Sequence, residues 1–163
     1  MSDYEIVIKN VPAQKIVSAR EVIARPELMR ERCIALMNAV ESLLKTNNVT
    51  PSGPSLAIYH NHSEAGIDTE MALIVPADTP SLQGGQAATR DLPGSTTMAA
   101  TTYRGSYDDH GAVGNLHQSL ARWIEQSGYR PTGPIREIYV QVPGTLGQGA
   151  SGVMELNWPV EKV

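Results

Sequence analysis

One nine-residue segment occurs twice in the sequence, and this internal repeat constrains the fold more than any other feature. Residues 51–59 (PSGPSLAIY) return 80 positions later as residues 131–139 (PTGPIREIY). Residues 71–76 and 154–159 form a second matching pair in the same order, at a spacing of 83 positions. Two ordered matches at nearly one spacing are typical of a duplicated structural unit rather than of chance. The chain is therefore expected to contain two copies of one unit.

The two copies predict the same order of secondary structure. Alternating apolar and polar residues predict strands, and apolar residues three or four apart predict a helix after the first strand. The halves are about residues 1–77 and 93–163, with residues 78–92 as a linker rich in turn-forming residues. The predicted strands are 16–23, 55–61 and 71–75, then 96–103, 135–142 and 153–158, and the helical stripes are Cys33, Met37, Val40 and Leu44, then Val113, Leu116, Leu120 and Ile124.

This order predicts an α+β fold class: a duplicated β-α-β-β unit with pseudo-twofold symmetry, in which an antiparallel sheet carries two helices. One half alone would expose a sheet face and an edge strand, so the halves are expected to join in a single domain. The seam between them would form a groove. Internal interfaces of this kind are preferred places for small-molecule sites.

Composition and charge exclude several classes of protein. The sequence has 13 Lys and Arg against 17 Asp and Glu, and this net charge of −4 argues against a direct nucleic-acid partner, which needs clustered cations. The single cysteine, Cys33, excludes an intrachain disulfide and fits a reducing compartment. The sequence shows neither a secretory signal nor about 20 consecutive apolar residues, so a cytoplasmic protein with no membrane partner is expected.

The second half contains an ordered set of motifs: residues 103–108 (YRGSYD), a helix ending at 123–128 (WIEQSG), residues 133–139 (GPIREIY) and residues 158–160 (WPV). In this order they resemble the GyrI-like small-molecule-binding domain, which occurs on AraC- and MerR-type bacterial regulators and as free-standing proteins. The resemblance spans nearly the whole chain. It implies a groove between the halves that binds lipophilic, often cationic aromatic compounds, with a buried glutamate at the position of Glu137.

Regulators of this family carry a DNA-binding segment ahead of the effector domain, whereas this chain starts directly with the first half. The resemblance therefore implies a free-standing binding or sequestering protein without a cofactor, rather than a transcription factor. The sequence leaves a homodimer open.

Glu137 has a feature that points to a ligand even without the resemblance. Strand alternation puts Ile135, Glu137 and Tyr139 on one face, and the position of Glu137 in the first half is occupied by Ala57. An acid that the fold itself needs would occur in both copies, whereas a shared groove needs only one ligand anchor. A desolvated carboxylate favours a partner of positive charge, so cationic ligands are expected.

Aromatic and sulfur-containing residues complete the predicted site. Tyr59, Tyr107 and Tyr139 offer aromatic faces to a cation, and Met154 and Trp158 offer adaptable apolar area. The competing interpretation is that these tyrosines simply pack in the core or at its rim.

A second competing interpretation concerns the acid. On a solvated sheet face, Glu137 would pair with a surface arginine such as Arg20 or Arg104 and contribute little.

Two further functions stay open beside the binding protein. Some free-standing members of the family open cyclopropane-bearing alkylating natural products by hydrolysis, and the resemblance makes Glu137 with Tyr59 or Tyr139 the candidate catalytic residues for such a reaction. A third function is a protein-interaction role such as gyrase inhibition. An exposed acidic patch would mark that role, and the carboxylates of this sequence are dispersed.

The histidines are interpreted as structural. His60 and His62 lie near Glu64, but no third metal ligand follows at the usual spacing, so a polar loop is favoured and no metal is expected. His110 and His117 are seven residues apart and share a helix face, which is more typical of a solvated or packed pair than of a ligand set.

Overall fold

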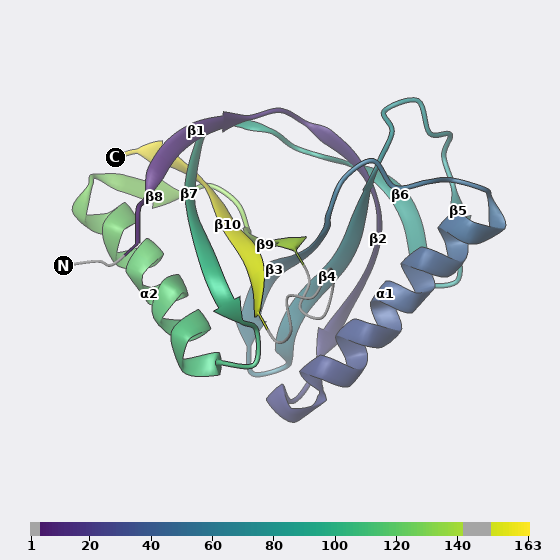
Figure 1. Cartoon of the computed structure of the whole chain (residues 1–163), viewed down its shortest axis with the longest axis horizontal. Coiled ribbons are helices and arrows are strands. Elements are labelled where there is room, and N and C mark those ends of the chain that lie inside the picture. The colour runs from purple at the N-terminus through teal and green to yellow at the C-terminus, as the bar shows by residue number, and fades with distance from the viewer. Residues whose placement is uncertain (1–3, 142–150) are drawn as a thin grey trace. The chain divides into compact units, whose positions relative to one another are not determined.

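The computed structural model describes residues 4–141 and 151–163, which form two compact units. Unit 2 is Pro12–Gly94, and unit 1 joins the residues before Pro12 to Ser95–Val163. The chain thus passes from one unit to the other twice, once after its first strand and once before Ser95 (Figure 1).

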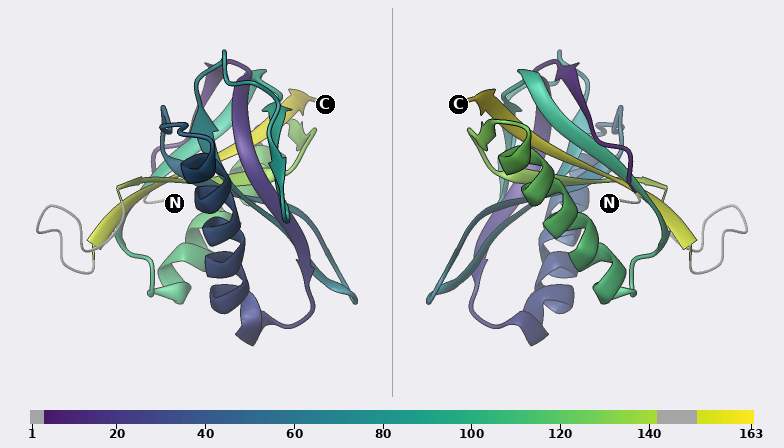
Figure 2. Two further views of the ribbon diagram at one scale, coloured as in Figure 1. Left: turned by 90° about the vertical axis from the view of Figure 1, so that its right-hand side faces the viewer. Right: turned by 90° about the vertical axis from the view of Figure 1, so that its left-hand side faces the viewer.

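Unit 2 is an antiparallel sheet with one long helix. Its strands lie in the order β3-β4-β2-β6-β5, and helix α1 packs against β2 and β4. The left view of Figure 2 shows α1 beside β2. The elements are β2 (Gln14–Ile23), a 3-10 turn (Pro26–Leu28), α1 (Met29–Thr46), β3 (Ser55–Ser63), β4 (Gly66–Val75), β5 (Gln83–Gly84) and β6 (Ala87–Leu92).

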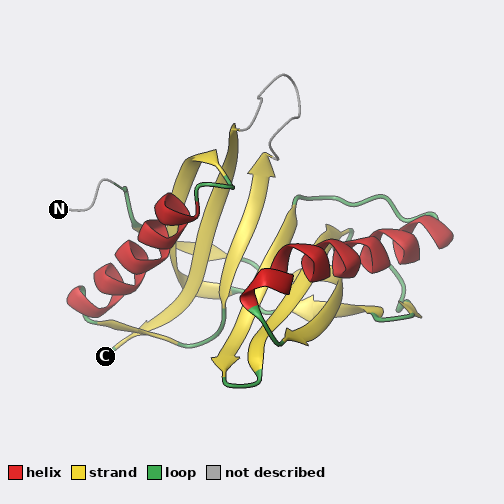
Figure 3. Cartoon of the chain, turned by 90° about the horizontal axis from the view of Figure 1, so that it is seen from below, coloured by secondary structure: helices red, strands yellow, loops and turns green. Residues whose placement is uncertain are grey.

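Unit 1 repeats this arrangement of a sheet and a helix. Its strands lie in the order β1-β7-β10-β9, with β8 paired to the end of β10, and α2 packs against β7 and β8. Figure 3 shows one helix in red beside the yellow strands of each unit. The elements are β1 (Val7–Val11), β7 (Ser95–Ser106), α2 (His110–Gln126), β8 (Tyr129–Pro131), β9 (Ile135–Gln141) and β10 (Ser151–Lys162).

Helix α2 begins and ends where its sequence predicts. The Asp109 side chain accepts a hydrogen bond from the Ala112 amide at 3.0 Å, which satisfies a backbone donor of the first turn. Gly128 follows the last turn with φ +78°, a left-handed conformation that terminates helices and favours glycine. Three predicted stripe residues, Leu116, Leu120 and Ile124, are buried. The predicted order of strand, helix, strand and strand and the α+β class are thereby confirmed in this unit, as they are in unit 2.

The linker prediction needs correction. Residues 78–92 contain β5 and all of β6, and β6 pairs with β2 from Gln14↔Leu92 to Ala19↔Ala87. The strand that precedes β2 in the chain, β1, pairs instead with β7. The sequence of β6, AATRDL, lacks the clear alternation of large apolar residues that identifies a strand, because it contributes small and charged side chains.

Helix α1 also differs in detail from its predicted stripe. Val40 and Leu44 are buried as predicted, but Cys33 is only half-buried. Leu36 and Leu43 are the residues that join Val40 and Leu44 in the core. The stripe is thus rotated toward these leucines, which leaves Cys33 at its border. Neither described helix combines the length and the apolar character that crossing a lipid bilayer requires.

Candidate functional site

Glu137 lies in the middle of β9 and is 7 % exposed. Tyr139, two residues further along the same strand face, donates a hydrogen bond from its hydroxyl to Glu137 Oε1 at 2.8 Å. On the neighbouring strand β10, Leu156 lies opposite Glu137 and Met154 lies opposite Tyr139, and both are buried. The carboxylate therefore sits among apolar neighbours on a face that the alternation of β9 predicts.

Helix α2 supplies a partner to this carboxylate that the sequence interpretation missed. His117 Nε2 lies 2.7 Å from Glu137 Oε2, which also shows that Glu137 points to the α2 side of its sheet. The sequence analysis interpreted His117 and His110 as a solvated or packed pair on one helix face. In the structure His110 is exposed, whereas His117 contacts Glu137. A weak signal for His117 existed, since it falls between the buried Leu116 and Leu120, but its partner lies 20 residues away on a strand.

Tyr107 joins the cluster from the turn between β7 and α2. Its ring centroid lies 5.6 Å from that of Tyr139, and the two ring planes are tilted by 51°. Its hydroxyl donates to the carbonyl oxygens of Gln141 at 2.8 Å and Val153 at 2.7 Å, where β9 and β10 change register. Burial, together with the negative charge of Glu137, raises the pKa of Tyr107 to about 12, so the phenol keeps its proton at neutral pH.

The structure does not bring every predicted residue to Glu137. Trp158 lies four residues beyond Met154 on β10, and its indole donates to the carbonyl of Gly133 at 3.0 Å. It lines a pocket of about 290 Å³ together with Tyr129 and Ile124. Tyr59 is half-buried on β3 of unit 2, and both its role and the groove predicted between the halves stay predictions.

The solvated-face interpretation of Glu137 is wrong, because this residue is buried. Arg20, one of the surface arginines considered as its partner, makes two hydrogen bonds to Asp68 instead, at 2.8 and 2.7 Å. Arg104, the other, is exposed.

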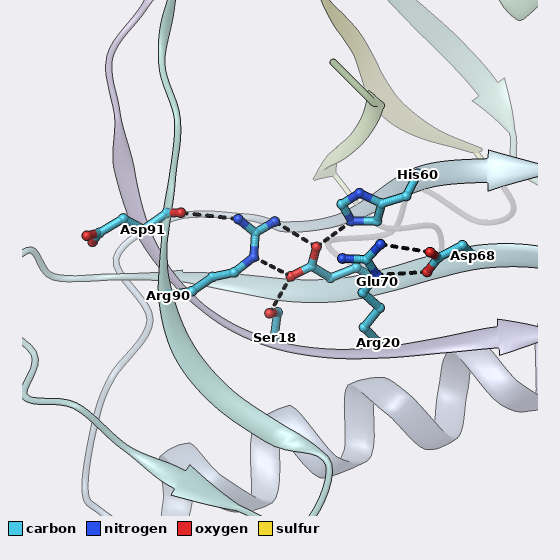
Figure 4. A network of polar contacts seen from close by, with 7 residues as sticks. All are labelled: Ser18, Arg20, His60, Asp68, Glu70, Arg90 and Asp91. Carbon is cyan, nitrogen blue, oxygen red and sulfur yellow. Dashed lines mark hydrogen bonds and ion pairs between the residues drawn. The ribbon is translucent and has the colours of Figure 1, made fainter.

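A second buried carboxylate, Glu70 on β4, lies in unit 2 and was not singled out from the sequence. It is 1 % exposed. Arg90 on β6 donates hydrogen bonds from Nε and Nη2 to both of its carboxylate oxygens, each at 2.7 Å. The hydroxyl of Ser18 on β2 donates to Oε2, and His60 Nε2 on β3 lies 2.7 Å from Oε1. Figure 4 shows the Glu70 carboxylate between the guanidinium and the imidazole, with Ser18 below.

These contacts keep Glu70 charged. Burial by itself would raise the pKa of Glu70, but the hydrogen bonds from Arg90, Ser18 and His60 lower it to about 2. Glu70 also points to the sheet face opposite α1. Glu21 marks the covered face because it pairs with Arg32 of α1, and the register sets Glu21 opposite Thr69, the neighbour of Glu70.

The described residues contain no group of three His, Cys, Asp or Glu side chains arranged to hold a metal ion. His60 belongs to β3 rather than to a loop, and its ring nitrogen contacts Glu70, while His62 is exposed.

The fold and the sequence together assign the chain to a class of ligand-binding domains. A family model for the GyrI-like small-molecule-binding domain matches residues 4–161, and the chain belongs to this family. No functionally curated protein matches the sequence.

Solved structures agree with this assignment at the level of the fold. The EcmrR C-terminal domain is similar with a TM-score of 0.82 and 22 % identity, over 99 % of this chain and 100 % of that domain. EcmrR in a complex with DNA gives 0.80 at 22 % identity, over 98 % of this chain, which spans 58 % of that longer one. SAV2435, described as bound to tetraphenylphosphonium, gives 0.55 at 10 % identity, over 98 % of this chain and 94 % of that one.

Proposed function

We propose that this chain binds lipophilic, cationic aromatic small molecules and that Glu137 provides the counter-charge. The observation that carries the proposal is a carboxylate only 7 % exposed, in contact with Tyr139 and beside the tilted ring pair of Tyr107 and Tyr139. Membership of a small-molecule-binding family supports it, as does the tetraphenylphosphonium bound to the similar SAV2435.

The physical argument starts from the cost of burying a charge. An ionised carboxylate removed from water is unfavourable by several kcal/mol unless positive charge or hydrogen bonds compensate it. An organic cation supplies that charge without the strong hydration of a metal ion or an ammonium group, so it loses little on leaving water. Each aromatic face adds about 0.5–2 kcal/mol to a cation that it contacts. The side chain of Met154 adjusts to ligands of different shape.

The test is a calorimetric titration with tetraphenylphosphonium, comparing the wild type with Glu137→Gln. The glutamine keeps the size and an acceptor for the Tyr139 hydroxyl but removes the charge, so we expect the Kd to rise by more than about tenfold. Glu161→Gln is the matched control, because Glu161 is an exposed carboxylate of the same unit, with 47 % of its side chain accessible. Equal affinity of Glu137→Gln and the wild type would refute the role of Glu137.

Hydrolysis is a second candidate function, and one observation favours it. The 2.7 Å contact between His117 and Glu137 is a carboxylate–imidazole pair, and such a pair can orient a general base that takes a proton from water. Incubation with a cyclopropane-bearing alkylating compound, followed by mass spectrometry, separates the two functions. A compound recovered unchanged after binding supports the binding protein, whereas a product heavier by one water supports the hydrolase.

A further inference from the structure

His117 places a titratable cation beside the carboxylate that the proposed function uses. Its Nε2 lies 2.7 Å from Glu137 Oε2, and it keeps 29 % of its side chain exposed, against 9 % for Glu137. Solvent therefore reaches the imidazole more readily than it reaches the carboxylate. A ligand cation and this imidazole compete for the same carboxylate.

The charge of the imidazole decides how strong that competition is. A protonated imidazole forms an ion pair with the carboxylate and compensates its charge, whereas a neutral imidazole donates a hydrogen bond and leaves the net negative charge in place. The imidazole thus stops competing with a permanently charged ligand as a counter-cation once it has lost its proton.

The other ionisable groups around His117 come from its own helix and from the strands of the same unit. Tyr139 on β9 and Tyr107 at the end of β7 are phenols, and burial and Glu137 hold the pKa of Tyr107 at about 12. Burial also raises the pKa of Tyr103 on β7. The unit also carries Asp109, His110, Arg122 and Glu125 at the start of α2 and along it, Arg104 on β7, Tyr129 and Arg130 on β8, Arg136 on β9, and Glu155, Glu161 and Lys162 on β10.

We propose that His117 determines the charge specificity of the site by acting as an internal counter-cation, so that binding of an organic cation at Glu137 releases one proton from His117. This inference rests on the proposed function of Glu137. It predicts that the site binds permanently charged cations more tightly as the pH rises. His60 and Glu70 show why the partner matters. The Glu70 carboxylate contacts His60 as well, but it is also hydrogen-bonded by Arg90, whose guanidinium carries a permanent positive charge.

The experiment measures binding of tetraphenylphosphonium, whose charge does not change with pH. Titration calorimetry at about pH 7.5 and about pH 5.5 gives the Kd, and buffers of different ionisation enthalpy give the number of protons released. For the wild type we expect a Kd about tenfold weaker at the lower pH, and release of up to one proton per ligand. The proton count needs no variant, so it tests the inference even where a substitution disturbs folding.

Two substitutions separate His117 from other sources of pH dependence. His117→Gln keeps a hydrogen-bond donor near Glu137 but never becomes charged, so its affinity should stay constant across this range without proton release. His110→Gln is the matched control, because it removes an exposed histidine from the same helix. It should behave as the wild type.

The outcomes separate this inference from the proposed function. If Glu137→Gln binds tetraphenylphosphonium as well as the wild type, the proposed function is wrong and the inference fails with it. If Glu137→Gln weakens binding, but the wild type releases no proton or His117→Gln keeps the full pH dependence, the inference alone is overturned. In the latter case the pH dependence would come from protonation of Glu137 itself.

Discussion

Among the described residues each unit buries one glutamate on its sheet, but the two carboxylates have different partners and lie on different faces. Glu70 in unit 2 faces away from α1 and is bound through two hydrogen bonds by the guanidinium of Arg90. Glu137 in unit 1 faces α2 and is bonded by an imidazole from that helix and by the phenol of Tyr139. Both are less than 10 % exposed.

The two carboxylates differ in whether the side chain that bonds them can lose its positive charge. The guanidinium stays charged at every accessible pH, and its two parallel hydrogen bonds match the carboxylate geometry, so the Glu70 network ties β6 to β4 across β2. An imidazole can exist charged or neutral, and the one that contacts Glu137 belongs to a helix rather than to a paired strand. We therefore interpret Glu70 as a residue of the fold and Glu137 as a residue of the proposed site.

The strongest test of this contrast is the stability of two matched variants. Glu70→Gln leaves Arg90 without its buried counter-charge, so we expect the free energy of unfolding to fall by about 3 kcal/mol. Glu137→Gln keeps an acceptor for Tyr139 and loses a contact to a partner of variable charge, so we expect a loss of about 1 kcal/mol or less. Urea denaturation of both variants measures this difference, and equal losses would break the contrast.

Acid should reproduce part of the Glu70 effect in the wild type. The folded pKa of about 2 lies below the ordinary value of 4.5, so the stabilisation is present above pH 4.5 and is lost as the pH falls toward 2. At about 1.4 kcal/mol for each pH unit, the part of the loss that falls between pH 7 and pH 3 is about 2 kcal/mol. Chemical denaturation at a series of pH values should show this loss in the wild type and a smaller one in Glu70→Gln.

The smallest expected effect compares two arginine pairs of unit 2. Arg90→Lys replaces two parallel hydrogen bonds to a buried carboxylate with a single point charge, and we expect a loss of about 1 kcal/mol. Arg20→Lys makes the same change in the exposed pair with Asp68, where solvent screening should limit the loss to about 0.5 kcal/mol or less. Thermal unfolding of the two variants ranks them. The reverse order would show that burial does not set the strength of these pairs.

Local patterns in the sequence predict the elements and the strand face of Glu137, whereas its burial was implied by the family resemblance. The alternation of Ile135, Glu137 and Tyr139 needs only the geometry of one strand, and the cap at Asp109 and the stop at Gly128 need only one helix. These features depend on residues close together in the chain.

Contacts between distant segments account for what the sequence did not predict. His117 reaches Glu137 across 20 residues, and Glu70 meets Ser18 across 52. The predicted strand at residues 71–75 begins one residue after Glu70, so the prediction gave Asp68 and Glu70 no strand alternation. β4 in fact begins at Gly66, which places both acids inside a strand. Trp158 shares a strand face with Met154, but four residues of extended chain separate them by about 13 Å, which is enough to place Trp158 beside Tyr129 and Ile124 instead of Glu137.

The pairing of β1 with β7 and of β6 with β2 decides how the protein could be dissected. A fragment cut at the boundary of the sequence repeat, after residue 77, would lack β6 and would carry a first strand whose partner is on the other fragment. The fragment Pro12–Gly94 would instead retain the β2–β4, β2–β6, β3–β4 and β5–β6 pairings. The complementary piece would then be two peptides, a short N-terminal strand and Ser95–Val163, that have to reassemble by edge-to-edge addition.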